Sequence, residues 1–279
     1  RPGVGLCAML KQNPATSAVP VIIVSVFQGA AARIAALRAG AADILTKPLH
    51  EATLLARVRN LLRLRGVDDE LRLPDSTASQ LGFNEMAAPF LAPAQVLLVS
   101  AGVGSLAGWR KTLSVEKAFK TKVLGQGQVL EAIGKQGLRP DVVILPAQSG
   151  SAQAGSAQAD AARDGLTLLA ELRARPESRH AAIIVFHDGV DQNTAVSALD
   201  MGANDVINAD APGEEFLLRV NAQLDRKRQA DRLRHTLADG LRLAVTDPLT
   251  GLFNRRYALP HLARIAERSR ATGEPFAVM

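Results

Sequence analysis

The apolar run Val21-Ile22-Ile23-Val24 and the later segment Gly40-Ala41-Ala42-Asp43 decide the fold, because both occur a second time in the chain. At a spacing of 162 positions and without a gap, they fall on residues 183–186 and residues 202–205. The register continues through Leu55 with Leu217, Arg57 with Arg219, Val58 with Val220 and Leu62 with Leu224. Similarity kept in one register over about 70 residues indicates a duplicated unit. We call residues 1–72 the first repeat and residues 93–228 the second repeat.

Each repeat alternates β-branched runs with helical patterns. A continuous apolar run is typical of a strand buried on both faces of a parallel sheet. In the first repeat we expect a helix through Leu6, Met9 and Leu10, a helix over 30–39 that stops at Gly40, a strand over 43–46 and a long amphipathic helix through Leu54, Leu55, Val58, Leu61 and Leu62. Runs at 95–99, 120–124 and 141–145 add three strands to the second repeat. Five βα units predict an α/β, doubly wound, flavodoxin-like fold.

Composition excludes several classes of protein. With 279 residues, 47% of them apolar, the chain can form about two ordinary domains, and its single cysteine, Cys7, excludes a disulfide framework and favours the cytoplasm. The longest apolar run, 19–27, is about half the length that spans a bilayer, so we expect no membrane insertion. The net charge of +6 is concentrated on a helical stretch at 226–242 without interleaved aromatic residues. That pattern favours a solvated helix face over nucleic-acid binding.

The strand ends of the first repeat carry the candidate chemistry, because functional groups of this fold gather at the carboxyl edge of the sheet. Ser25 follows one strand, and Lys47-Pro48 follows the next. With Gly40 to Asp43 and the repeat, these residues resemble the C-terminal half of a response-regulator receiver domain. The resemblance implies that Ser25 donates a hydrogen bond to a phosphoryl oxygen, that Lys47 neutralises the phosphoryl charge and that Pro48 follows a cis peptide bond. The phosphoacceptor and the Mg²⁺ ligands would lie before Arg1.

The second repeat departs from that pattern at every functional position. Ser100 and Ala101 stand where acidic ligands are expected, Pro146 replaces the phosphorylatable Asp, His187 replaces the Ser or Thr, and Ala209-Asp210 replaces Lys-Pro. We expect a degenerate receiver that acts as an adaptor. Gly102-Val-Gly104 matches a dinucleotide fingerprint but lacks the acidic residue that should close the next strand, so nucleotide binding there is not expected.

The last residues contain the most specific motif of the chain. Residues 247–257 read Asp-Pro-Leu-Thr-Gly-Leu-Phe-Asn-Arg-Arg-Tyr and resemble the N-terminal signature of GGDEF domains, carried by Asp247, Leu249, Thr250, Asn254, Arg255 and Arg256. We expect Asp247 to be a helix N-cap with Pro248 at the first helical position. An amphipathic helix and a strand over 276–279 would follow. The chain starts without Met and ends inside this expected strand, which is typical of a fragment.

A helix over about 214–244 connects the second repeat to this motif. Beyond residue 228, Leu233, Leu237 and Leu241 recur at helical spacing as a narrow apolar stripe. Such a stripe favours a coiled-coil stalk in a homodimer, and a helix that packs on its own domain is the alternative.

The order of these parts resembles the PleD-type response regulators, with a partial receiver at 1–72, a linker at 73–92, a degenerate receiver at 93–228, a stalk at 229–246 and a GGDEF start at 247–279. The resemblance implies a sensor histidine kinase as phosphodonor, Mg²⁺ as cofactor, and a phosphorylation-controlled output that makes cyclic di-GMP from two GTP. No catalytic residue of that output lies in this chain. Two alternatives remain: a catalytically inactive GGDEF protein that senses cyclic di-GMP or docks a partner, and a DNA-binding response regulator, which the motif at 247–257 argues against.

Overall fold

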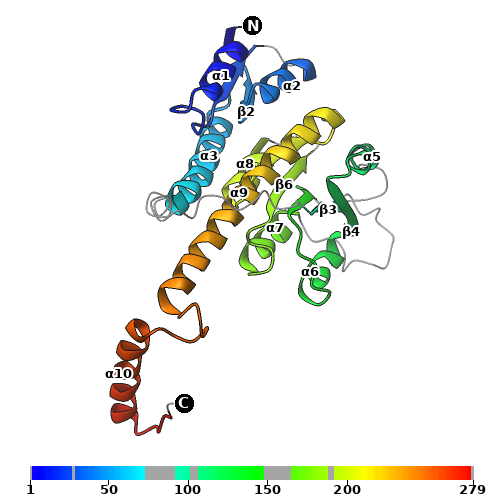
Figure 1. Cartoon of the computed structure of the whole chain (residues 1–279). Coiled ribbons are helices and arrows are strands. Elements are labelled where there is room, and N and C mark those ends of the chain that lie inside the picture. The colour runs from blue at the N-terminus through cyan, green and yellow to red at the C-terminus, as the bar shows by residue number, and fades with distance from the viewer. Residues whose placement is uncertain are drawn as a thin grey trace, which may run out of the picture. The chain divides into compact units, whose positions relative to one another are not determined.

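A computed structural model of the chain describes residues 2–26, 29–72, 92–100, 106–147, 165–187 and 192–277. Its elements, most of which are labelled in Figure 1, are α1 (Pro2–Gln12), β1 (Ile22–Ser25), α2 (Ala30–Arg38), β2 (Asp43–Thr46), α3 (Glu51–Arg72), β3 (Ala94–Ser100), α5 (Ala107–Val115), β4 (Phe119–Gly125), α6 (Gln126–Gly134), β5 (Val142–Pro146), α7 (Gly165–Ala174), β6 (Ala182–His187), α8 (Gln192–Asp200), β7 (Asp205–Asn208), α9 (Gly213–Val245) and α10 (Arg255–Thr272).

The second repeat forms a parallel five-stranded sheet in the order β4-β3-β5-β6-β7. One face of the sheet packs on α6, α7 and α8, and the other packs on α5 and the first part of α9. The central strands are apolar on both faces, and every residue of β5 is buried. This strand order, with helices on both faces, confirms the predicted doubly wound flavodoxin-like fold.

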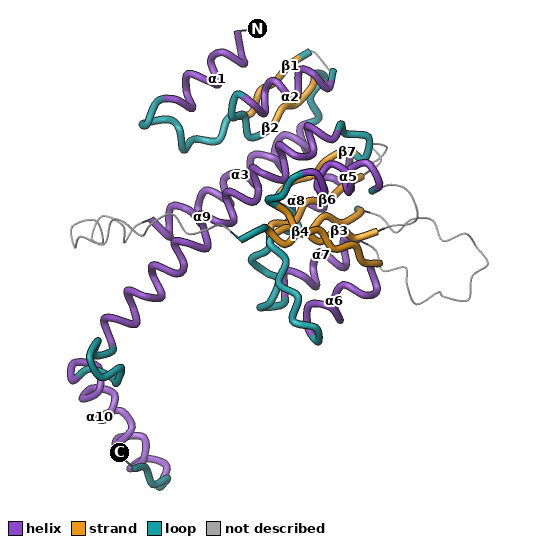
Figure 2. Tube along the Cα trace, turned by 45° about the vertical axis from the view of Figure 1, so that its right-hand side comes forward, coloured by secondary structure: helices purple, strands orange, loops and turns teal. Residues whose placement is uncertain are grey.

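The first repeat forms a parallel pair, β1 and β2, with α1 and α2 on one side (Figure 2). The boundaries of β2 and the end of α2 before Gly40, with φ +86°, match the sequence-based prediction. The predicted burial of β1 is wrong: Val24 is 41% exposed, whereas the equivalent β6 lies between two strands and is buried. The expected core positions Leu6 and Met9 of α1 are exposed as well, and α1 contributes Cys7 to the core instead.

Equivalent cations bind carbonyl oxygens of the equivalent loop in both repeats, and in the second repeat the cation also binds a second loop. In the first repeat, Lys11 Nζ donates to the carbonyl oxygens of Ser17 and Val19. Its counterpart in the second repeat, Arg173, donates to the carbonyl oxygens of Gly202, Arg179 and Ala181. Burial, with a smaller contribution from Arg63, lowers the pKa of Arg173 to about 10. Arg173 therefore holds the loop at residues 179–181 against Gly202, in the turn that follows α8.

The glycine that ends each helix makes room for this cation. A Cβ on Gly40 would lie 2.9 Å from Lys11 Cγ, and Gly202, with φ +108°, faces the Arg173 side chain in the same way. Only glycine adopts such a backbone conformation without strain, which explains why Gly occurs at both positions.

The predicted long helix is confirmed as α9, and α10 follows it after a short loop. None of the side chains of α10 is buried in the structure. Phe276 and Ala277 are not part of a strand, and residues 278–279 lie outside the described ranges. The same holds for residues 73–91 of the expected linker and for the Gly102-Gly104 fingerprint. Within the described residues, no helix is both long and apolar enough to cross a membrane.

Gly165 at the start of α7 is expected to be the least replaceable glycine. An added Cβ there would overlap the carbonyl oxygen of Pro146, which is backbone and cannot rotate away. Gly165→Ala should therefore lower the free energy of unfolding by about 2–3 kcal/mol. Urea denaturation followed by circular dichroism measures the change. Gly127→Ala in α6, where nothing lies near the new methyl group, is the control and should be neutral or slightly stabilising. Equal effects of the two substitutions would contradict this packing.

Candidate functional site

The predicted phosphoryl-switch residues of the first repeat lie at one edge of the sheet. Ser25 and Thr46 are register partners at the ends of β1 and β2, and the Lys47 N–H donates to the Ser25 carbonyl oxygen at 2.8 Å. Lys47 is exposed, and the Lys47–Pro48 peptide bond is cis, as the resemblance implied. The topology thus brings Ser25, Lys47 and Pro48 to the edge at which an anion would bind. Their roles in phosphoryl binding stay predictions.

The second repeat keeps the backbone of this edge and changes its chemistry. The Ala209 N–H donates to the His187 carbonyl oxygen at 2.7 Å, the bond that Lys47 and Ser25 make in the first repeat. No lysine side chain accompanies it, because Ala209 and Asp210 replace Lys-Pro. Pro146 is buried at the end of β5, with Gly165 packed on its carbonyl oxygen. The residues of this edge do not fit Mg²⁺, since neither Ser100 nor Pro146 offers a carboxylate.

No group of three or more His, Cys, Asp or Glu side chains among the described residues could hold a metal ion. Among the described residues, His187 is therefore not part of a candidate metal site.

Two aspartates and two arginines connect the repeats. We call Asp43, Arg57, Asp205 and Arg219 the Asp–Arg quartet. Arg57 contacts Asp43 of its own repeat at 2.8 Å and Asp205 of the other at 2.6 Å. Arg219 contacts Asp205 of its own repeat at 2.9 Å and Asp43 of the other at 3.0 Å. Each aspartate also accepts the N–H of the residue that follows it, Ile44 or Val206. The quartet is therefore nearly symmetric under exchange of the repeats.

The quartet is largely excluded from solvent: Asp43, Asp205 and Arg219 are at most 5% exposed. Burial by itself would raise the pKa of Asp205, but the guanidinium groups of Arg219 and Arg57 outweigh it and hold the pKa at about 2. Burial would likewise lower the pKa of Arg219, whereas the carboxylates of Asp205 and Asp43 raise it. Asp205 and Arg219 are therefore charged at neutral pH.

Further contacts surround the quartet and differ between the repeats. We call them the rim contacts: Arg33 with Glu215 at 2.8 Å, Arg38 with Glu214 at 2.6 Å, Arg59 with Asp200 at 3.4 Å, Asn60 Nδ2 with the Ala203 carbonyl oxygen at 2.6 Å, and an Arg63 N–H with the Leu199 carbonyl oxygen at 2.8 Å. In the middle of this contact, Ala56 of α3 enters the core of the second repeat.

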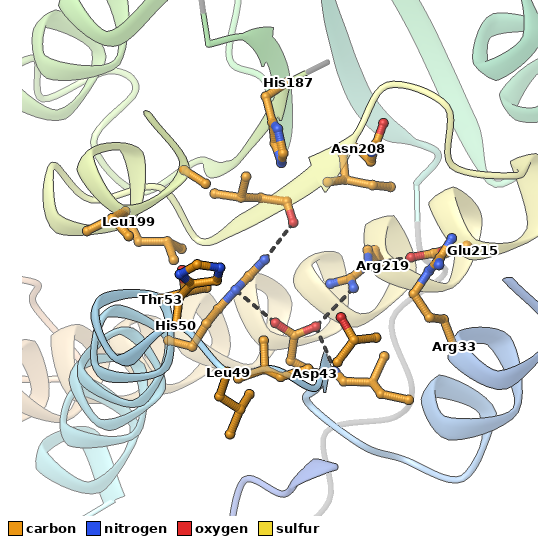
Figure 3. A pocket seen from close by; sticks show the side chains of 18 of the residues that line it. Arg33, Asp43, Leu49, His50, Thr53, His187, Leu199, Asn208, Glu215 and Arg219 are labelled. Atoms are coloured by element: carbon orange, nitrogen blue, oxygen red, sulfur yellow. Dashed lines mark hydrogen bonds and ion pairs between the residues drawn. The ribbon is translucent and has the colours of Figure 1, made fainter. Parts of the chain in front are cut away.

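A cavity of about 430 Å³ lies beside the quartet, between the two repeats (Figure 3). Leu49 and His50, which directly follow Lys47-Pro48, line it from the first repeat. His187 and Asn208, from the strand ends of the second repeat, line it from the other side. The loop that contains the predicted switch lysine therefore reaches the contact between the repeats.

Sequence reasoning proposed the switch residues but missed the quartet, although the sequence contains a signal for it. The repeat register pairs Asp43 with Asp205 and Arg57 with Arg219. These charged residues occur in both repeats, whereas the switch residues occur in only one. Charges shared by two otherwise divergent repeats indicate a common structural contact.

The GGDEF-type motif forms a loop that is closed by its own side chains. Asp247 Oδ1 accepts the N–H groups of Leu249 and Thr250 and the Thr250 hydroxyl at 2.9–3.1 Å. These bonds lower the pKa of Asp247. The prediction that Asp247 caps a helix is wrong: α10 begins at Arg255 and is capped by Asn254, whose Oδ1 accepts the Tyr257 N–H. Asp247 is followed by a turn and not by a helix, because the chain reverses at Gly251, with φ +70°, before α10 begins.

Asn254 also binds the preceding helix. Its Nδ2 donates to the Ala244 carbonyl oxygen at 2.8 Å, and its backbone N–H donates to the Val245 carbonyl oxygen at 2.8 Å. The other motif residues, Arg255 and Arg256, are exposed at the start of α10. In the stalk segment of α9, Leu233 and Leu237 are partly buried and Leu241 is 69% exposed.

Removing one arginine of the quartet should be costly. Arg219→Ala leaves two buried carboxylates facing Arg57 alone, so the free energy of unfolding should fall by about 3–5 kcal/mol. Arg38→Ala, which breaks a pair whose side chains are 67% and 46% exposed, is the control and should cost less than about 1 kcal/mol. Chemical denaturation of the chain gives both values. A small loss for Arg219→Ala would show that the quartet is not a stabilising contact.

Acid should weaken the contact between the repeats. The pKa of Asp205 in the folded chain, about 2, lies below the value near 4 of an unfolded aspartate. Its stabilising contribution is therefore complete above about pH 4 and is lost as the pH falls towards 2. Thermal unfolding between pH 2 and pH 5 should show this loss, and Asp205→Asn should flatten the profile. An unchanged slope in the variant would contradict the assignment.

Comparisons with known proteins agree with this picture. Residues 1–59 match the response regulator receiver domain family. Over 279 residues, 99% of this chain, the sequence is 32% identical to response regulator PleD of Caulobacter vibrioides strain NA1000 / CB15N, and it spans 58% of that protein's length. It is also 39% identical over 74 residues, 26% of this chain, to sensory transduction protein RegX3 of Mycobacterium tuberculosis strain ATCC 25618 / H37Rv, covering 32% of it.

Among solved structures, the signal receiver domain of an HD domain-containing protein from Pseudomonas fluorescens Pf-5 matches 54% of this chain and 98% of its own, at 18% identity and a TM-score of 0.44. The flavodoxin-like topology itself is given by the strand order of the second repeat. Residues 1–59 thus match the response regulator receiver domain family, and the chain as a whole is similar to PleD over nearly its entire length.

Proposed function

We propose that this chain is the regulatory part of a two-component response regulator whose phosphorylation controls the synthesis of cyclic di-GMP. The observation that carries the proposal is the similarity to response regulator PleD over 99% of the chain, which extends through both repeats to the GGDEF-type motif. The edge formed by Ser25 and Lys47 supports the receiver role, and the motif at 247–257 supports the output role.

In this proposal the first repeat receives a phosphoryl group from a sensor histidine kinase in the cytoplasm. Lys47 supplies a point charge at the carboxyl edge of the sheet, and Ser25 supplies a hydroxyl one strand away. Both are suited to bind phosphoryl oxygens. The acceptor and its Mg²⁺ are proposed to be held by residues outside this chain. A partial receiver at 1–72, a linker at 73–92 and an adaptor at 93–228 are the domain boundaries that fit this role.

The second repeat serves as an adaptor rather than as a second receiver. Its strand ends carry Pro146, His187 and Ala209 where phosphoryl chemistry would need an acceptor, a hydroxyl and a lysine. What it offers is a firm contact to the first repeat through the Asp–Arg quartet. A change at the Lys47-Pro48 loop would reach the adaptor through Leu49 and His50, which line the cavity between them.

The output would join two GTP molecules, each held by one GGDEF domain that begins at residue 247. Because two such domains must face each other, pairing of two chains is the natural variable for control. The stalk at 229–246, with Leu233, Leu237 and Leu241, is proposed to form the seam of this homodimer. A protein that dimerises on activation but makes no cyclic di-GMP would favour the alternative of an inactive GGDEF sensor.

Lys47→Ala should uncouple phosphorylation from output. Lys47 is exposed, so its loss should leave the melting temperature nearly unchanged. In a protein with complete receiver and output domains, a phosphoryl mimic such as beryllium trifluoride should raise cyclic di-GMP synthesis from GTP, and the variant should not respond. Lys135→Ala, at an exposed lysine that directly follows α6, is the control. Normal switching of the Lys47 variant would refute the assigned role.

Charges in the stalk seam should abolish the activated dimer. Leu233→Glu with Leu237→Glu would place carboxylates in an apolar seam, a cost of several kcal/mol for each buried charge. Sedimentation of the activated protein, run beside a GTP turnover assay, should show monomers and no activity. Ala238→Glu, at an exposed position of the same helix, is the control and should leave both unchanged. A double variant that stays dimeric and active would mean that the helix packs on its own domain.

A further inference from the structure

The rim contacts are not repeated by the internal symmetry that relates the two repeats. The Asp–Arg quartet would form equally well between two first repeats or two second repeats, because each repeat supplies one aspartate and one arginine at equivalent positions. Around it, the rim residues Arg59, Asn60 and Arg63 of α3 correspond to Asn221, Ala222 and Asp225 of α9. The quartet therefore stabilises the pairing of like and of unlike repeats equally. Any preference for the unlike pair must come from the rim contacts.

A pair of second repeats would lose the rim contacts. If a second copy of the second repeat took the place of the first, Ala195 would stand where Arg33 binds Glu215, a residue that is 3% exposed. Asp225 would face the Leu199 carbonyl oxygen in place of Arg63. Asp200 would face Glu214 in place of Arg38. One buried carboxylate would lose a partner, and two further contacts would become repulsive.

A pair of first repeats would be disfavoured by a different contact. Arg38 would stand where Asp200 binds Arg59, so two arginines would meet. Arg33 would face Thr53 in place of Glu215. Both like pairings thus carry penalties that the unlike pairing avoids, and like-charge juxtaposition of this kind is an effective way to reject a partner.

We infer that the face formed by α8, β7 and α9 selects a first-repeat face as its partner and excludes a second copy of itself, and that the rim contacts make this choice. The surface therefore keeps the receiver and the adaptor of one chain together, and it does not become a self-association site when the two separate.

The test uses the whole chain in three forms, all with Leu233→Glu and Leu237→Glu so that the stalk does not contribute. The released form adds Asn60→Glu and Arg63→Glu, which aim carboxylates at the carbonyl oxygens of Ala203 and Leu199 without altering the core of the first repeat. The self-compatible form also carries Ala222→Asn and Asp225→Arg, which give α9 two rim residues of α3, and Asp200→Asn in α8, which removes the repulsion from Glu214. The charge control carries Glu131→Gln and Glu116→Arg in their place, at exposed positions away from this face.

Small-angle scattering should show the repeats apart in the released form, and sedimentation should show it monomeric although the second-repeat face is free. The self-compatible form should dimerise with a dissociation constant lower by about tenfold or more, and the charge control should not. The inference is overturned if the released form dimerises as tightly as the self-compatible form, if the self-compatible form stays monomeric, or if the repeats of the released form stay together. Because the stalk is disabled throughout, each of these results is independent of the proposed cyclase.

Discussion

Four charged side chains decide how the two repeats are held. Asp43 and Asp205 are nearly excluded from water, and each is neutralised by one arginine from its own repeat and one from the other. An ion taken out of water without a partner costs several kcal/mol, so neither aspartate tolerates separation of the repeats without rehydration. The cavity with Leu49 and His50, and the Lys47-Pro48 loop just before them, adjoin this contact. The candidate switch residues therefore lie next to the contact between the repeats.

The two repeats also show which parts of a fold stay when its chemistry is lost. The second repeat keeps the parallel strands, the cation clamp of Arg173 and the bond from the Ala209 N–H to the His187 carbonyl oxygen. The side chains at the strand ends differ, with His187 in place of Ser25 and Ala209 in place of Lys47. Backbone geometry at these strand ends is set by the sheet register, so it is kept although the side chains there differ.

Local patterns predicted the elements well and the contacts between repeats poorly. The run at 21–24, the glycine at 40 and the strand at 43–46 were readable because period and turn chemistry act within a few residues. The buried face of α3 was missed, since Asn60 and Arg57 look like solvent residues while Leu55 and Leu62 look like core. Their burial depends on carbonyl and carboxylate groups more than 140 positions away, which no local pattern contains. At the motif, Asp247 and Asn254 are both plausible caps, and only the turn at Gly251 decides between them.

Asn254 has a mechanical meaning beyond capping. One amide side chain binds the last turn of α9 through Ala244 and the first turn of α10 through Tyr257. Asn254 therefore links the end of α9 to the start of α10, although it lies ten positions after Ala244 in the sequence. A rotation of α9 about its own axis would have to break the bonds of Asn254 or move the start of α10 with it. Asn254 thus couples the orientation of α10 to that of α9.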